Sequence, residues 1–122
     1  MDHYEIWCDL KDGRKDLEFA NAVQEYLGSL RERGLIEGFR LARRKLGFGP
    51  PELGEFRITI TVRSLAQLDE AFGVVARRAG AVEERHARVY HLVAGARFGL
   101  YRDFPDPQRA EAAGPPERGG PS

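Results

Sequence analysis

The side chains best suited to chemistry stand at alternate positions of two short segments, 3–10 and 55–62. Glu5 in the first segment could act as a general base, and Arg57 in the second could bind a carboxylate through two parallel hydrogen bonds. Apolar residues occupy the positions between the polar ones, which is typical of a strand that buries one face. Chemistry is therefore expected on the polar face of a sheet.

Two further strand-like segments, 36–45 and 96–102, add candidates to this polar face. With Glu5 as its candidate catalytic residue, its candidate ligand-binding residues are Trp7, Arg40, Arg57, Thr59 and Tyr101, and Thr61 and Arg97 would complete the lining. Arg40 and Arg57 together could hold a small anion. The simpler interpretation, which we favour, is that these groups form ion pairs and hydrogen bonds between two protomers.

His86 is the second candidate catalytic residue. It lies on the apolar face of an expected helix over 82–94, one turn after Val82 and near Tyr90. An imidazole there could be an acid, a base or a heme ligand, although a packed histidine with one satisfied nitrogen is the more common case. No pair of histidines with ligand spacing occurs, so the sequence indicates neither a metal site nor a cofactor.

Length and composition restrict the class of protein. The chain has 122 residues, of which 42% are hydrophobic, and it carries 19 basic and 19 acidic residues. This predicts one globular domain and gives no electrostatic reason to expect nucleic acid or an anionic membrane as a partner. Cys8 is the only cysteine, no apolar stretch approaches the roughly 20 residues of a spanning helix, and the N-terminus lacks a signal-peptide profile. A cytoplasmic protein is expected.

Two helices and a third helical stretch connect the expected strands. The first follows the Asp12-Gly13 turn and runs to about Gly34, with an apolar stripe through Leu17, Ala20, Val23, Leu27 and Leu30, widened by Phe19 and Tyr26. Ser64 and Gln67 form a capping box that opens the second helix, whose inward stripe includes Phe72. The third stretch, 82–94, is expected to stop at Gly95, and helix is preferred there although residues 89–93 could be a strand by composition.

The resulting order β-α-β-β-α-α-β predicts an α+β ferredoxin-like sandwich: a four-stranded antiparallel sheet with its helices on one face. The first and third strands are neighbours in this topology, so Glu5 and Arg57 are expected side by side. The uncovered face with its large aromatic residues invites a second copy of the chain, giving a two-fold homodimer. The domain is expected over 1–104, followed by a flexible tail rich in Pro and Gly over 105–122.

Four stretches of the chain resemble a small uncharacterised bacterial family of the dimeric α/β-barrel superfamily. They are His3-Tyr4-Glu5-Ile6, Lys45-Leu46-Gly47-Phe48-Gly49-Pro50, Leu65-Ala66-Gln67-Leu68-Asp69 and Leu100-Tyr101-Arg102-Asp103-Phe104-Pro105. The resemblance covers about residues 2 to 107. It implies two ferredoxin-like protomers that enclose a barrel between their sheets. The superfamily includes cofactor-free monooxygenases, heme enzymes, isomerases, dehydratases and ligand sensors. The resemblance therefore does not indicate which reaction, if any, this protein catalyses.

Two smaller features have structural explanations. The loop Gly47-Phe48-Gly49-Pro50 joins two strands rather than a strand and a helix, so a fixed turn, or a lid with Phe48 as the plug of a barrel mouth, is expected in place of a phosphate loop. Cys8 falls on the core side of its strand, where a thiol is inert.

Two functions remain open from the sequence. The first is a homodimer that binds or converts a small, anionic or aromatic metabolite in a cavity between sheet and helices or between two sheets. The second is a non-catalytic interaction module whose polar sheet face serves only as the dimer interface. An internal cavity of a few hundred Å³, the size that small ligands need, would favour the first function.

Overall fold

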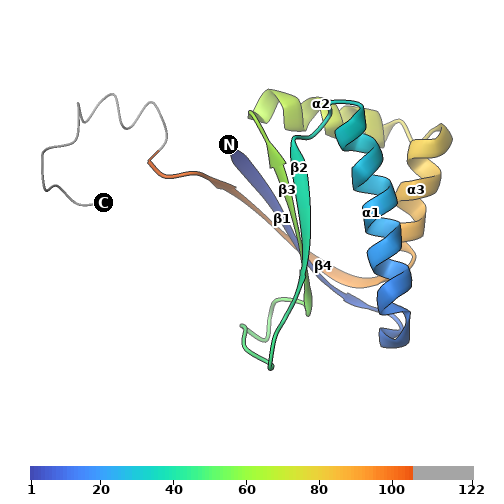
Figure 1. Ribbon diagram of the computed structural model, residues 1–122, viewed down its shortest axis with the longest axis vertical. Helices are drawn as coiled ribbons and strands as arrows, with labels where there is room; N and C mark the ends of the chain where they lie inside the picture. The colour runs from blue at the N-terminus through green and yellow to red at the C-terminus, as the bar shows by residue number, and fades with distance from the viewer. Residues whose placement is uncertain (106–122) are drawn as a thin grey trace, which may run out of the picture.

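The computed structural model describes residues 1–105, which form a four-stranded sheet with three helices on one of its faces (Figure 1). The elements are β1 (Asp2–Leu10), the 3-10 helix η1 (Gly13–Lys15), α1 (Asp16–Glu32), β2 (Gly38–Arg43), β3 (Phe56–Val62), α2 (Leu65–Ala76), α3 (Gly80–Tyr90) and β4 (Val93–Arg102). The sheet is antiparallel with strand order β2-β3-β1-β4, so the predicted ferredoxin-like fold is confirmed. The tail predicted over 105–122 lies outside the described residues from 106 onward.

Alternation along the central strands separates the two faces of the sheet as predicted. In β3, Phe56, Ile58, Ile60 and Val62 are buried against the helices, while Arg57 between them is exposed. In β1, Cys8 is buried on the same side. None of the helices in residues 1–105 has both the length and the hydrophobicity needed to cross a bilayer.

Helix α1 differs from the predicted stripe at its first turn. Leu17 is 76% exposed, whereas Phe19 is completely buried and begins the stripe that continues through Val23, Leu27 and Leu30. The prediction that Leu17 begins the apolar stripe was wrong. Both Leu17 and Phe19 are compatible with the spacing of the later apolar residues, and the direction in which α1 leaves η1 determines that Phe19 is the buried one. Gly34 follows the helix with φ +74°, as predicted for a terminating glycine.

Gln67 extends the predicted capping box into a link between two helices. The Ser64 hydroxyl accepts a hydrogen bond from the backbone N–H of Gln67 at 3.2 Å, which confirms the cap. The buried Gln67 side chain accepts from the N–H of Arg63 at 2.7 Å and donates to the carbonyl of Gly34 at 3.0 Å. The start of α2 is thereby fixed to the end of α1.

The boundary between α3 and β4 lies earlier than the spacing predicted. Helix α3 ends at Tyr90, and β4 begins at Val93 rather than at 96. The backbone N–H of Lys11 donates to the carbonyl of Leu92 at 2.9 Å, so pairing with the long strand β1 prevails over the helical spacing of this segment. Gly95 does not end a helix. It has φ +70° and lies where the β1–β4 register shifts, which is the conformation of a β-bulge.

The start of β1 and the end of β4 are joined by an ion pair between the buried Asp2 and the exposed Arg102, and its contribution should depend on pH. Arg102 donates from Nε to the Asp2 carboxylate at 2.6 Å, and this guanidinium lowers the pKa of Asp2 below its ordinary value of 3.8. Stabilisation from a lowered pKa is complete above the ordinary value and is lost as pH falls through the folded-state value. We therefore expect Asp2→Asn to reduce the loss of stability on acidification below about pH 4.

Urea unfolding of the wild type and Asp2→Asn at a series of pH values measures this effect. Asp69→Asn, at an exposed position of α2, is the control that removes a carboxylate without removing this contact. Parallel pH profiles for the wild type and Asp2→Asn would contradict the assignment.

Candidate functional site

The sheet separates the predicted site residues into two groups. His86 on α3 lines a cavity between the helices and the sheet, together with Tyr4 and Ile6 of β1. Glu5 stands between these two residues in β1, so it lies on the opposite, open face of the sheet. The two candidate catalytic residues, Glu5 and His86, are therefore not parts of one site.

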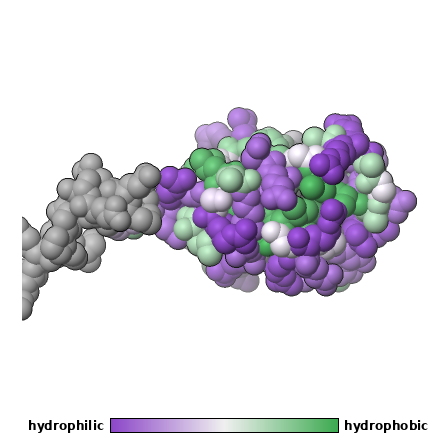
Figure 2. All heavy atoms as spheres, turned by 90° about the horizontal axis from the view of Figure 1, so that it is seen from above, coloured by the Kyte–Doolittle hydropathy of each residue, from purple (hydrophilic) through white to green (hydrophobic). Residues whose placement is uncertain are grey.

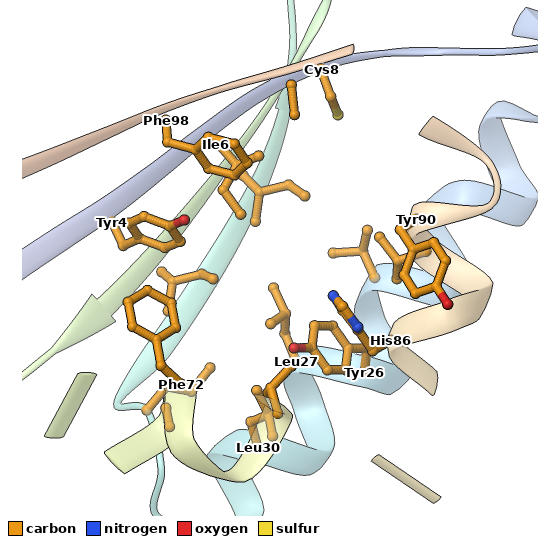
Figure 3. Close-up of a pocket in the computed structure, with 18 of the residues that line it drawn as sticks. Tyr4, Ile6, Cys8, Tyr26, Leu27, Leu30, Phe72, His86, Tyr90 and Phe98 are labelled. Atoms are coloured by element: carbon orange, nitrogen blue, oxygen red, sulfur yellow. The ribbon is translucent and has the colours of Figure 1, made fainter. Parts of the chain in front are cut away.

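The helix-side cavity has a volume of about 300 Å³ and an almost entirely apolar lining (Figure 3). Its walls come from the helix-facing side of the sheet and from all three helices. Three of its lining side chains, Phe72, Tyr90 and Phe98, remain exposed, so the cavity opens to solvent. The face of the molecule shown in Figure 2 carries an apolar area within a hydrophilic rim. This volume lies at the lower end of the range of small-ligand sites.

A polar cluster adjoins the α3 side of this cavity. The His86 ring lies between those of Tyr26 and Tyr90, with centroid separations of 5.2 and 4.9 Å. Glu83, one turn before His86, places Oε2 3.8 Å from His86 Nδ1 and accepts a hydrogen bond on Oε1 from the Tyr90 hydroxyl at 3.4 Å. Oε2 is buried and has no hydrogen-bond partner among the described residues. Such an atom is uncommon, because buried polar atoms are nearly always paired.

Two phenols add hydrogen-bonding groups to the cavity. Figure 3 shows the side chains of Tyr4, Tyr26 and His86 directed toward the space between sheet and helices. Burial, with the nearby Glu83 charge as the second cause, raises the pKa of Tyr26 to about 12, and burial also raises the pKa of Tyr4. Both phenols therefore stay neutral and can donate a hydrogen bond to a ligand.

The thiol of Cys8 also borders the cavity but fits the inert role predicted for it. It is 2% exposed, and burial, assisted by the charge of Asp9, raises its pKa to about 11. A thiol with this pKa is almost completely protonated at neutral pH, so it is a poor nucleophile.

Two side chains of this cluster, Glu83 and Tyr26, were not among the predicted site residues. Glu83 precedes His86 by three residues, a spacing that places both on one helix face and could have been noticed. Tyr26 was interpreted as part of the apolar stripe of its helix. Only the packing of α1 against α3 brings its ring to His86.

On the open face, the strand register places Glu5 and Arg57 in different rows. Glu5 is opposite Thr59, whose hydroxyl donates to Glu5 Oε2 at 2.5 Å. Arg57 is opposite Trp7, so the prediction that Arg57 stands beside Glu5 was wrong by two positions. A slip of two residues leaves every side chain on the same face, so the hydrophobic pattern cannot detect it.

The remaining open-face residues flank these rows. Arg40 is opposite Thr59, and Arg97 is opposite Trp7 on the side away from Arg57. The rings of Trp7 and Tyr101 lie above Gly99, where an added Cβ would come within 3.1–3.4 Å of them. No group of three or more His, Cys, Asp or Glu side chains suited to a metal ion occurs within residues 1–105, and the absence of a metal stays a prediction.

Comparison with solved structures shows similarity of fold. A protein from Arabidopsis thaliana has a TM-score of 0.65 at 12% identity, over 84% of this chain and 95% of that chain. HapK from Hahella chejuensis has a TM-score of 0.64 at 12% identity, over 87% and 95% of the two chains. A dimeric ferredoxin-like protein of unknown function from Jannaschia sp. has a TM-score of 0.63 at 12% identity, over 84% and 98%. Sequence identities this low indicate a shared fold and give no information about activity.

The sequence itself matches one family model over nearly its whole length. No curated protein matches the chain. The model described as "Family of unknown function (DUF6614)" matches residues 1–114, which include every element of the sheet and the helix layer. The chain therefore belongs to the family of unknown function DUF6614.

Proposed function

We propose that this protein binds a small, largely apolar or aromatic metabolite in the helix-side cavity. The observation that carries the proposal is Glu83 Oε2, which is buried without a hydrogen bond and lies 3.8 Å from Nδ1 of His86, a residue that lines an open cavity of about 300 Å³. Packing alone does not explain a buried carboxylate oxygen without a hydrogen bond, because buried polar atoms are nearly always paired. A ligand with one hydroxyl or N–H group would satisfy Oε2.

The polar cluster also supports proton exchange with such a ligand. Glu83 lies within ion-pair distance of the His86 imidazole, and Tyr26 supplies a neutral donor nearby. The ligand's apolar body would contact Ile6, Leu27 and Leu30, while its polar end faces α3. This arrangement favours a ligand with a single polar end.

The proposal includes a homodimer formed through the open face of the sheet. The Jannaschia protein with the same fold is described as dimeric. In this chain the open face presents Trp7, half-buried, and Tyr101, 58% exposed, beside charged side chains. Such a dimer leaves the helix-side cavity of each protomer free, because the cavity lies behind the sheet.

A cavity-filling substitution tests the proposed binding. Ala71 is 4% exposed and lines the cavity, so Ala71→Phe should fill it and abolish binding of compounds that raise the melting temperature of the wild type. The screen would use small phenols and aromatic ketones. Ala66→Phe, at an exposed position of the same helix, is the matched control and should bind normally.

A second variant covers the case in which Ala71→Phe does not fold. Tyr26→Phe removes only the phenol oxygen and should weaken binding about fivefold to tenfold, the worth of one hydrogen bond. Equal binding by the wild type, Ala71→Phe and Tyr26→Phe, or a screen with no stabilising compound, would reject the cavity as the ligand site. The second result would favour an interaction module that uses only its sheet face.

A further inference from the structure

The loop between β2 and β3 is held in one shape by hydrogen bonds at both of its ends. The Arg44 guanidinium donates from Nη2 to the carbonyls of Pro50 and Leu53, each at 2.7 Å. The backbone N–H of Arg44 donates to the carbonyl of Glu55 at 2.7 Å, and the N–H of Glu55 donates to the Asp9 carboxylate at 2.9 Å. These hydrogen bonds give the loop a defined conformation.

The loop and the open face of the sheet border a second, open pocket of about 390 Å³. Trp7 on β1 and Phe48 on the loop contribute aromatic rings, and Arg57 on β3 and Lys45 on the loop contribute positive charges. Phe48 is 81% exposed, although the loop that carries it is fixed. The ring at the edge of the pocket is available to contact a molecule bound there.

The charges around the pocket are unbalanced. Arg43 is neutralised by Glu55 at 2.6 Å and by Asp16 at 3.0 Å, and the Arg44 guanidinium is occupied by the loop carbonyls. Within residues 1–105, Arg57 and Lys45 have no acidic partner. Glu55 is the only acidic residue that lines the pocket, and its carboxylate is already paired with Arg43. The pocket therefore has two uncompensated cations and no free carboxylate.

We propose that this pocket is a second binding site, specific for a small aromatic carboxylate. The planar guanidinium of Arg57 suits the two oxygens of a carboxylate, and Lys45 adds a second positive charge. The rings of Trp7 and Phe48 suit the flat apolar part of such a molecule. The site lies on the open face of the sheet, which is also the face of the proposed dimer, so in that dimer it would adjoin the partner's sheet; it does not depend on ligand binding in the helix-side cavity.

Trp7 makes the site directly observable, because it is the only tryptophan in the chain and it lines the pocket. Benzoate is the probe, and benzamide, which has nearly the same shape without the charge, is the matched ligand control. Benzoate is expected to change the Trp7 fluorescence with saturation, to bind more weakly as salt is raised, and to bind much more tightly than benzamide.

Variants of the full chain assign the effect to the pocket. Arg57→Gln should weaken benzoate binding about tenfold or more, since a hydrogen-bonded charge is lost, and Lys45→Gln should weaken it less. Arg77→Gln, which removes one charge from the surface beyond α2, should leave binding unchanged. Light scattering on each variant separates lost binding from a change in oligomeric state.

Two results would overturn the proposal. One is equal affinity of the wild type for benzoate and benzamide. The other is unchanged benzoate affinity in both Arg57→Gln and Lys45→Gln. The Lys45 variant keeps the test decisive if Arg57→Gln does not fold, because Lys45 is an exposed loop residue.

Discussion

Phe19→Ala is expected to lower the free energy of unfolding by about 3–5 kcal/mol, the largest loss we expect from a single substitution in this chain. Phe19 has no exposed surface, and its ring meets that of Phe56 edge to face with 5.2 Å between centroids. Truncation removes the contact between α1 and β3 and leaves a cavity that the surrounding strands cannot fill. Urea unfolding followed by circular dichroism measures the loss.

Leu17→Ala is the matched control for Phe19→Ala. It removes an apolar side chain from the same helix two positions earlier, but Leu17 is 76% exposed. We expect a change within about 0.5 kcal/mol, as for most surface substitutions. Equal losses for the two variants would show that α1 is rotated relative to the orientation described here.

Gly54→Ala is expected to cost about 3 kcal/mol of folding stability, at the upper end of the usual range for overpacking. A Cβ at this position would lie 2.3 Å from the carbonyl carbon of Cys8 and 2.4 Å from its oxygen, so backbone must move. The movement would displace the loop from β1 and disturb the pocket that Trp7 lines. Thermal unfolding and the Trp7 fluorescence response to benzoate should therefore change together.

Gly28→Ala provides the comparison for Gly54→Ala. An added Cβ at Gly28 meets nothing within 4 Å, and the residue lies inside α1. This substitution should stabilise the protein by about 0.5–1 kcal/mol, since alanine favours a helix over glycine. If Gly54→Ala is as stable as the wild type, the close approach of the loop to Cys8 is not present in solution.

The two sites proposed here differ in character because the sheet divides the molecule. The helix side offers an apolar cavity with a histidine, a carboxylate and phenols at its edge. The open side offers rings and unpaired cations. A molecule that satisfies one site would be poorly suited to the other, so ligand screens should include both neutral aromatic compounds and aromatic carboxylates.

Patterns within single segments were enough to predict the ferredoxin-like order of the elements and the two faces of the central strands. Period-two alternation in β1 and β3 assigned Glu5, Trp7 and Arg57 to the open face, and the capping box located the start of α2. These features depend on neighbouring residues in the chain. Local backbone geometry converts such patterns directly into structure.

Which of these residues meet depends on how the elements pack together. The register that pairs Arg57 with Trp7, and not with Glu5, differs from the predicted one by two residues, and such a shift leaves the hydrophobic pattern unchanged. The contact between Tyr26 and His86 depends on how α1 packs against α3. Contacts of this kind join positions far apart in the chain and are fixed by the packing of many side chains at once, so no spacing within one segment encodes them.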